Sequence, residues 1–433
     1  MAVSFIVTIL VGTLLLLFPF STKSGHISLI DALFTSTSAV CVTGLVVQDT
    51  STYFAPTGQV IILILFQLGG LGIMTFSTMI LLAAGRKISI KDTIIIQEGF
   101  HHVAPKDFRS LIRNIFFFTL FIELAGTLFL FLHFLRDTPW PRALYHSFFH
   151  AVSAFCNAGF SLFSDSFISY KGDVLVNTTV VILIVLGGLG FLVLQEGKEI
   201  LFVLFKRKKR HLSLHTKLVL ILTLILIVLS FVFFFLIERN HSLKTFAGGE
   251  KALSSLFQVI TPRTAGFNTI DLSYLSSASV FLLILLMFIG ASPGSTGGGV
   301  KTSTMGVIFA FLKSKIAARE SVSIFRRTLP FPLVTRAFLV ISLSLSIIFL
   351  SSFILLLSEP TVSLREVLFE VFSAFSTVGL SLGLTQKLSA LGKIVITLTM
   401  YIGRIGPLTL LYTFSRPRAL GRYEYVEESV MIG

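Results

Sequence analysis

The sequence predicts an all-α polytopic membrane protein, in which four repeats of span, re-entrant pore loop and span place eight transmembrane helices around a central pseudo-fourfold pore. Three observations lead to this fold class: the composition, eight long apolar runs, and a motif that recurs four times. Of 433 residues, 54% are apolar and 13% charged, and the mean hydropathy is +0.90. Soluble globular chains carry about 25% charged residues, so this composition excludes them and indicates lipid as the solvent.

Eight apolar runs are long enough to cross about 30 Å of hydrocarbon, which takes about 20 residues. They lie at 3–20, 59–84, 111–135, 174–205, 217–237, 279–312, 337–357 and 394–414. The first basic residue, Lys23, follows the first run. That run therefore lacks the basic leading segment of a cleavable signal peptide and is interpreted as a span.

The charges outside the spans predict the orientation. The loops after the second, fourth and sixth runs, together with the tail, carry 22 basic and 9 acidic residues, and the other side carries 11 of each. Because cytoplasmic loops are enriched in Lys and Arg, we expect both termini on the cytoplasmic side of a bacterial inner membrane. Topology thus explains the net charge of +14, and we expect no nucleic-acid partner.

A short pattern recurs four times on the predicted outer side. The copies read FTSTSAVCVTGL, HAVSAFCNAGF, FQVITPRTAGF and VFSAFSTVGL, with glycines at Gly44, Gly159, Gly266 and Gly379. A second glycine follows 25, 28, 24 and 24 residues later, at Gly69, Gly187, Gly290 and Gly403. A helix of about 13 residues is too short to cross, and irregular backbone at membrane depth lines a water-filled path or is buried in protein. Four such loops therefore predict a pore.

The repeat divides the chain into quarters. We expect repeat 1 at 1–85, repeat 2 with its preceding cytoplasmic loop at 86–205, repeat 3 with a broken second span at 206–312, repeat 4 at 313–415, and a cytoplasmic tail at 416–433. Ser28 with Asp31, and Ser363 with Glu366, have capping-box spacing and predict the starts of two re-entrant helices. The negative C-terminal ends of these helices would favour a cation on the axis.

The loop triplets are the candidate ion site, because glycine lets backbone carbonyls turn toward the axis and rings of carbonyls replace the water shell of potassium. The fourth triplet, TVG, matches the start of the potassium-channel filter, and the others are degenerate copies. The predicted filter residues are Val42, Thr43, Gly44, Asn157, Ala158, Gly159, Thr264, Ala265, Gly266, Thr377, Val378 and Gly379. Turn chemistry could explain one such glycine, but four at regular spacing favour a filter. Cys41 and Cys156, three residues before two of the glycines, are interpreted as packing thiols.

Acidic residues follow three of the loops. Asp49, Asp165 and Asp271 lie five or six residues after the glycines, whereas the fourth repeat has Leu384. Each alone would be a solvated loop residue. Their recurrence at one offset predicts an outer vestibule that concentrates cations.

The sixth span is interrupted by GASPGSTGGGVKT at 290–302, which is too rich in glycine, with one proline, to remain a regular helix. It superficially resembles a phosphate-binding loop, but it has one residue too many before the lysine and follows a membrane span, so nucleotide binding is rejected. We expect an obstruction beneath the filter. The predicted gate residues are Gly290, Ala291, Ser292, Pro293, Gly294, Ser295, Thr296, Gly297, Gly298, Gly299, Lys301 and Arg404. Burying an arginine such as Arg404 in the membrane costs free energy, and such residues are usually functional. Arg404 could both repel a passing ion and clamp free carbonyls of the interrupted span, because the two roles are compatible.

Other polar residues in the membrane are assigned to structure. Glu123 in the third span is expected to bond backbone or a serine. His146 and His150 share a helical face, but no acid lies near them with metal-site spacing, so we expect packing there. No catalytic constellation emerges, and neither enzymatic activity nor a covalently bound cofactor is expected.

The four loops, CNAGF and RTAGFN in particular, the SPGSTGGGVKT interruption and Arg404 make the chain resemble the potassium transporters of the Ktr, Trk and HKT superfamily. The resemblance covers essentially the whole chain and is greatest to the membrane subunits of bacterial Ktr systems. It implies potassium as the substrate, a homodimer with one pore in each subunit, and a cytosolic KtrA-type regulatory ring that alone binds ATP and ADP. It maps the gate loop onto 290–301 and the pore arginine onto Arg404. In HKT relatives, serine in place of the first filter glycine goes with sodium selectivity, so Gly44 favours potassium.

Two departures qualify the filter. Arg263 stands where the other repeats have a small residue, and the second glycine of potassium-channel filters is missing, so looser selectivity is expected. Sodium coupling or stimulation stays open. The alternatives are a constitutively open cation channel without a regulatory partner and, from another class, a multispan membrane enzyme.

Overall fold

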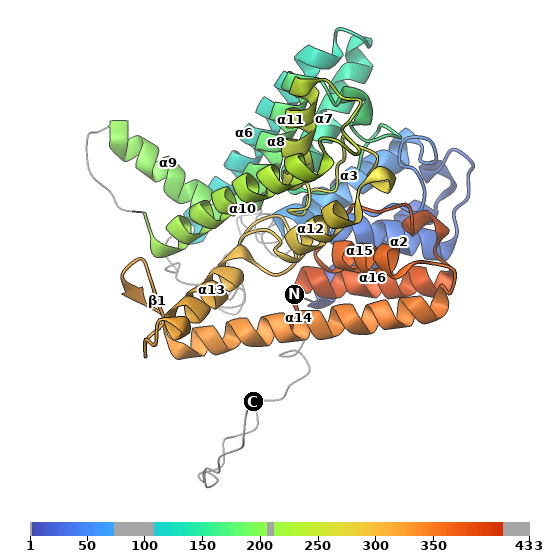
Figure 1. Cartoon of the computed structure of the whole chain (residues 1–433). Coiled ribbons are helices and arrows are strands. Elements are labelled where there is room, and N and C mark those ends of the chain that lie inside the picture. Colours follow the sequence, from blue (N-terminus) through green and yellow to red (C-terminus); the bar gives the residue numbers. More distant parts are fainter. Residues whose placement is uncertain (1, 73–107, 206–211, 410–433) are drawn as a thin grey trace.

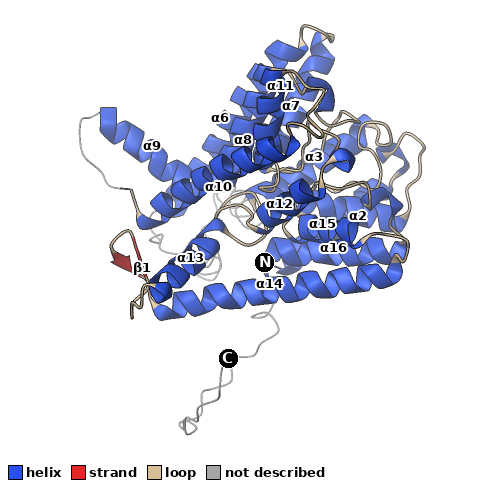
Figure 2. Ribbon diagram, viewed as in Figure 1, coloured by secondary structure: helices blue, strands red, loops and turns tan. Residues whose placement is uncertain are grey.

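The computed structural model describes residues 2–72, 108–205 and 212–409, and this part of the chain is mostly helical with almost no sheet (Figure 2). The end of the predicted second span, most of the loop after it, the centre of the basic stretch near 206–211 and the tail lie outside the described residues. In the described part, strands form only one short antiparallel hairpin, β1 (Ser323–Ile324) with β2 (Arg327–Thr328). The division of the chain into quarters at the boundaries given above stays a prediction.

Each repeat contains a first helix, a short re-entrant helix and a second helix, in the order that the sequence predicts (Figure 1). The helices are α1 (Ala2–Leu17), α2 (Leu29–Val40), α3 (Pro56–Leu71), α6 (Phe108–Phe134), α7 (Trp140–Cys156), α8 (Val174–Leu189), α9 (Phe191–Phe205), α10 (Leu214–Glu238), α11 (Gly248–Ile260), α12 (Ser277–Phe288), α13 (Thr302–Ile316), α14 (Phe331–Ser358), α15 (Leu364–Phe375) and α16 (Ala390–Ile405). Single 3₁₀ turns are η1 (Pro19–Ser21), η2 (Ile168–Tyr170), η3 (Leu272–Tyr274) and η4 (Thr385–Lys387).

The repeats close into a ring. The second helix of every repeat packs against the re-entrant helix of the next: α3 against α7, α8 against α11, α12 against α15, and α16 back against α2. The four re-entrant helices have 12, 17, 13 and 12 residues, too few to cross a bilayer. The predicted all-helical, pseudo-fourfold architecture is therefore confirmed.

Capping explains where two re-entrant helices begin. Ser363 and Glu366 form the complete predicted capping box at the start of α15. At the start of α2, the Ser28 hydroxyl accepts from the Asp31 N–H at 3.1 Å. The Asp31 carboxylate forms no reciprocal bond there, because it pairs with the Lys393 ammonium of α16 at 2.6 Å. This ion pair links repeats 1 and 4.

Among the described residues, three helices are long and apolar enough to cross a membrane: Arg113–Phe134, Leu214–Glu238 and Phe331–Ser358. They expose many leucines and phenylalanines, as lipid-facing helices do. The run at 174–205 was predicted to be one span. The structure has two helices there, α8 and α9, whose axes are bent by 102° relative to each other. Gly190, at φ 95°, makes this bend.

Besides the predicted interruption of the sixth span, the second helix of each of the other repeats ends at a glycine with positive φ. Helices α3, α8 and α16 end at Gly72, Gly190 and Gly406, each three residues after the second glycine of its repeat. Those second glycines allow close packing. A Cβ on Gly69, Gly187 or Gly403 would lie 1.7 to 2.0 Å from a carbonyl oxygen near the C-terminal end of the re-entrant helix in the same repeat.

Candidate functional site

The four filter triplets share one unusual backbone conformation. The φ angle is positive at the first residue of each triplet, 58° at Val42, 58° at Asn157, 74° at Thr264 and 52° at Thr377, and again at each glycine, between 71° and 93°. Residues other than glycine rarely adopt positive φ. Such strain persists only where the surrounding structure imposes it, which is common at functional sites.

Backbone hydrogen bonds impose this conformation in the same way in each repeat. The middle residue of each triplet donates its N–H to a carbonyl four or five residues earlier, on the re-entrant helix or, in repeat 3, at its C-cap. These bonds are 2.8 to 2.9 Å long and join Thr43 to Ser38, Ala158 to Ser153, Ala265 to Thr261, and Val378 to Ser373. The loops are thus extensions of the re-entrant helices and inherit their rigidity.

The glycines bring the loops together. A Cβ on Gly44 would lie 2.5 Å from the Ala158 carbonyl oxygen, and the same contact follows from Gly159 to Ala265 at 3.0 Å. A Cβ on Gly266 would likewise lie 2.6 Å from the Val378 carbonyl oxygen, and a Cβ on Gly379 would lie 2.2 Å from the Thr43 carbonyl oxygen, which closes the ring. Four loops therefore meet in the cyclic order 1, 2, 3, 4, with no room for a side chain at the glycines. All twelve predicted filter residues come together in this ring.

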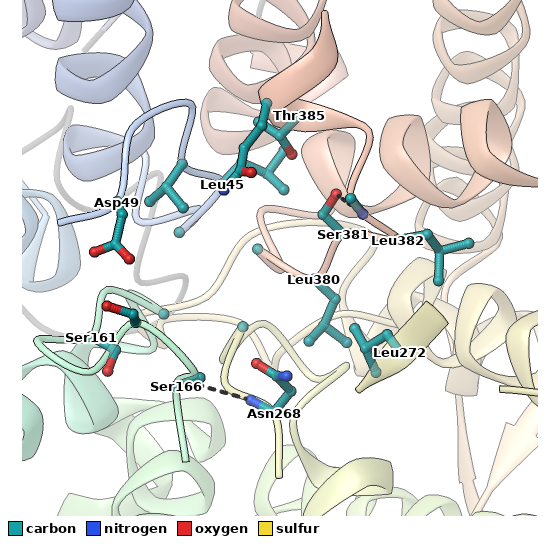
Figure 3. A pocket seen from close by; sticks show the side chains of 18 of the residues that line it. Leu45, Asp49, Ser161, Ser166, Asn268, Leu272, Leu380, Ser381, Leu382 and Thr385 are labelled. Carbon is teal, nitrogen blue, oxygen red and sulfur yellow. Dashed lines mark hydrogen bonds between the residues drawn. The ribbon is translucent and has the colours of Figure 1, made fainter. Parts of the chain in front are cut away.

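A cavity of about 410 Å³ opens above the ring and is lined by the four loop glycines. Segments from all four repeats surround it (Figure 3). Of the three predicted vestibule aspartates, Asp49 and Asp271 line the cavity and Asp165 does not. The Asp165 carboxylate accepts from the backbone N–H of Ser169 at 3.0 Å and from the Ser169 hydroxyl.

The vestibule aspartates also hold their own turns. The Asp49 carboxylate accepts from the backbone and hydroxyl of Ser51, both at 2.7 Å, and Asp271 accepts in the same way from Ser273. Burial alone would raise the pKa of Asp49, but hydrogen bonds from Ser51, Ser164 and Thr52 outweigh it and lower the pKa below its ordinary value. Asp49 therefore stays ionised at neutral pH.

One acidic residue near the predicted filter was not singled out from the sequence. Glu370 on α15 is completely buried. Its carboxylate accepts from the Ser381 hydroxyl at 2.7 Å and from the Thr385 hydroxyl. Ser381 and Thr385 both line the vestibule (Figure 3). An isolated glutamate in a helix gives no pattern of its own, and only an alignment of the four repeats could have drawn attention to it.

The segment 290–302 forms a closed loop between α12 and α13. Its base is joined by the Gly290 N–H, which donates to the Val300 carbonyl at 2.9 Å, and by a bridge between Ile289 and Val300. Inside the loop, the Lys301 ammonium donates to the Gly297 carbonyl at 2.7 Å. A helical span precedes the loop, which supports the rejection of a phosphate-binding loop.

This loop lies directly against the filter triplets. The Gly298 N–H donates to the Thr377 hydroxyl at 3.0 Å. A Cβ on Gly298 would lie 2.4 Å from that hydroxyl, and one on Gly297 would lie 2.1 Å from the Thr264 hydroxyl. The glycines of the loop therefore permit contact with the first residues of the third and fourth triplets.

The same loop is docked in the break of the fourth span. The Phe191 N–H donates to the Gly294 carbonyl at 2.9 Å, and Ser292 and Thr296 donate their N–H groups to the Gly188 and Gly187 carbonyls at 3.0 and 3.2 Å. The carbonyls freed by the bend at Gly190 are in this way satisfied by the loop.

Arg404 joins three elements. From α16, its guanidinium donates one hydrogen bond to the Thr296 carbonyl of the loop and one to the Gly69 carbonyl of α3. The predicted clamp on carbonyls of the broken segment is present. Thus Arg404 contacts the segment 290–301, which itself lies against the predicted filter triplets; that they form a gate stays a prediction.

Glu123 is buried in α6 and accepts from the Gln67 amide of α3 at 3.0 and 3.2 Å. The Cys156 thiol donates to the side-chain amide oxygen of Gln67 at 3.0 Å. The partner is therefore an amide of a neighbouring repeat, where backbone or a serine was expected. The cluster connects repeats 1 and 2.

His150 is completely buried, with Nδ1 at 2.7 Å from the His146 carbonyl. Its Nε2 accepts from the Leu162 N–H at 3.2 Å, so the imidazole is a neutral acceptor at that nitrogen. Its ring stacks on Phe163 with centroids 4.5 Å apart. In the described part of the chain, no three metal-ligating side chains gather around it.

The comparisons with known proteins agree over the whole chain. The TrkH family model, described as cation transport protein, matches residues 1–420. Ktr system potassium uptake protein B of Bacillus subtilis is 40% identical, over 96% of this chain and 92% of the relative. The protein of the same name from Vibrio alginolyticus is 38% identical, over 99% and 93%. Potassium/sodium uptake protein NtpJ of Enterococcus hirae is 36% identical, over 100% and 96%.

A solved structure has the same fold. The potassium transporter TrkH from Vibrio parahaemolyticus matches with a TM-score of 0.73 and 21% sequence identity, over 96% of this chain and 85% of that one. The family is a transport family rather than an enzyme family. On the strength of the family match and of relatives near 40% identity, this chain belongs to the TrkH family of membrane cation transport proteins.

Proposed function

We propose that this chain is the membrane subunit of a potassium uptake system, and that its four triplets form a potassium-selective filter. The observation that supports this most is the closed ring of four loops with one shared positive-φ backbone. Rigid rings of carbonyls replace the hydration shell of an ion. The relatives in Bacillus and Vibrio that carry potassium uptake in their names are similar over nearly their full length.

The segment 290–301 and Arg404 act as the gate of this path. The loop contacts the Thr264 and Thr377 side chains of the filter, and Arg404 ties it to the opposite side of the ring. An ion that leaves the filter inward meets this loop. Displacement of the loop, and release of its bonds to Arg404 and α8, then opens the path.

Asp49 and Asp271 attract cations into the vestibule, since fixed negative charge raises the local cation concentration. Membrane potential drives potassium inward through the filter, with both termini in the cytoplasm of a bacterial inner membrane. The name of the Enterococcus relative includes sodium, which favours sodium as a coupling or stimulating ion.

Two copies of the chain assemble, each with its own pore, on a cytosolic nucleotide-binding ring of KtrA type. Two relatives are named as parts of a Ktr system, and such a system implies partner subunits. ATP and ADP act on that ring, and the membrane chain itself needs only its substrate ion.

Growth of a potassium-uptake-deficient bacterium on low potassium tests the proposal. The chain should restore growth strongly when a cytosolic nucleotide-binding partner is expressed with it, and weakly without. Equal rescue without the partner would favour the constitutively open channel. Absence of rescue in both arms, with the chain present in the membrane, would contradict potassium uptake.

A further inference from the structure

A buried polar group occupies one position in two of the four repeats. Nine residues before the loop glycine, the repeats carry Thr35, His150, Phe257 and Glu370. His150 and Glu370 have no exposed surface. Both lie on re-entrant helices, α7 and α15, directly behind the filter triplets.

Both groups bond the same place in the loop, two residues after the glycine. The Glu370 carboxylate accepts from Ser381 at 2.7 Å, and His150 Nε2 lies 3.0 Å from the Ser161 hydroxyl. Each has a second partner in the same loop, the Thr385 hydroxyl for Glu370 and the Leu162 N–H for His150. Ser161 and Ser381 line the vestibule (Figure 3).

Repeats 1 and 3 lack this arrangement. The Thr35 hydroxyl is buried without a hydrogen-bond partner in the described part of the chain, and Phe257 is apolar. Their residues two after the glycine are Val46 and Asn268. Asn268 is held by bonds to Ile270 and Ser166 instead.

The two braced loops face each other across the pore, because the loops contact one another in the order 1, 2, 3, 4. A displacement of either braced loop changes the distance across the ring. The carbonyls of the neighbouring triplet move with it, since each loop is the continuation of a rigid helix.

We propose that His150 and Glu370 are positioning residues: they fix the second and fourth filter loops and thereby set the preference of the filter for potassium over sodium. This inference rests on the proposed function. The inference concerns hydrogen bonding: the two carboxylate oxygens of Glu370 and the single Nε2 of His150 each hold two groups of the vestibule wall in place.

Uptake of potassium in competition with sodium tests it, in cells that depend on the chain and its partner. Ser381→Ala and Ser161→Ala should each lower the ratio of the sodium inhibition constant to the potassium KM by about fivefold, the size of one lost hydrogen bond. Glu370→Ala removes the bonds to both Ser381 and Thr385 and should lower the ratio by at least as much. Glu370→Gln keeps an acceptor and a polar partner for both hydroxyls and should stay within about twofold of the unsubstituted chain. The double variant of Glu370→Ala with Ser381→Ala should be no worse than Glu370→Ala alone.

Thr35→Ala is the matched control, because it removes a buried hydroxyl at the equivalent position that has no hydrogen-bond partner among the described residues. It should leave the ratio unchanged. The amount of each variant in the membrane is measured in parallel, and the serine variants decide the matter if Glu370→Ala does not reach the membrane.

An unchanged ratio in Ser381→Ala and Ser161→Ala at normal abundance would overturn the inference. Loss of selectivity in Glu370→Gln as large as in Glu370→Ala would also overturn it, because the effect would then be one of charge. If the unsubstituted chain itself takes up no potassium, the proposed function fails, which is a separate outcome.

Discussion

Replacement of Arg404 is the change with the largest expected effect on transport. The guanidinium donates to the Thr296 carbonyl of the gate loop and to the Gly69 carbonyl of α3. It is the residue through which α16 holds the loop against the other side of the ring. Arg404→Gln removes the charge and the two-pronged geometry together, and Arg404→Lys keeps the charge alone.

The size of the effect follows from the bond that Arg404 makes to the loop. A hydrogen bond from a charged donor contributes about 1.5 kcal/mol or more net, and of the two bonds only the one to Thr296 must break when the loop moves, because Gly69 lies on α3. Because 1.4 kcal/mol is a factor of ten in an equilibrium constant, the closed loop loses about tenfold in population relative to the open loop. We expect a rise in flux of up to about tenfold, since flux saturates when the loop is mostly open.

Initial rates of rubidium uptake, as a tracer for potassium, measure this effect in cells with matched amounts of the chain in the membrane. Arg404→Lys should also raise the rate, because a single ammonium cannot reach both carbonyls in the same geometry. Arg365→Gln is the control, since Arg365 also donates to a backbone carbonyl, that of Leu275 at 2.8 Å, but away from the gate. Equal or lower flux in Arg404→Gln at normal abundance would refute the clamp.

Three further predictions concern the filter and the vestibule. Gly44→Ser should abolish potassium-selective uptake, because its Cβ would lie 2.5 Å from the Ala158 carbonyl oxygen; potassium-dependent growth of the variant would contradict the ring geometry. Neutralising Asp49, Asp165 and Asp271 together should raise the half-saturating external potassium severalfold at low salt, and most of the effect should come from the two that line the cavity; unchanged uptake kinetics would remove the vestibule. The lowered pKa of Asp49 means that its contribution to stability is present above the ordinary aspartate pKa, near 3.9, and is lost only as pH falls through the lowered value. Potassium affinity, measured by uptake between pH 8 and 5, should therefore not change through Asp49, and a decline centred near pH 6 would contradict this.

Repetition made most of the site predictable from the sequence. Gly44 and its three counterparts are recognisable because each stands in a similar motif at a similar interval, and the same reasoning located Arg404 beside Gly403. Composition and charge then identified the membrane and its expected orientation. Local chemistry also sufficed for the capping box at Ser363 and Glu366.

Contacts between distant segments were not predictable. The bend at Gly190 is stabilised by the Gly294 carbonyl of another repeat, and no local pattern distinguishes Gly190 from the preceding glycines Gly187 and Gly188. Glu370 and His150 differ chemically, so their common place appears only when the repeats are aligned on the loop glycine. The partners of Glu123 were missed for the same reason, since Gln67 lies on another span.

The most direct test of the central claim is ion flux through the purified chain in liposomes. With a potassium gradient and a membrane potential negative inside, we expect potassium uptake that exceeds sodium uptake and that rises when Arg404 is replaced. Equal potassium and sodium fluxes, or no flux with either the unsubstituted chain or the Arg404 variant, would contradict a potassium-selective path through the four-loop ring.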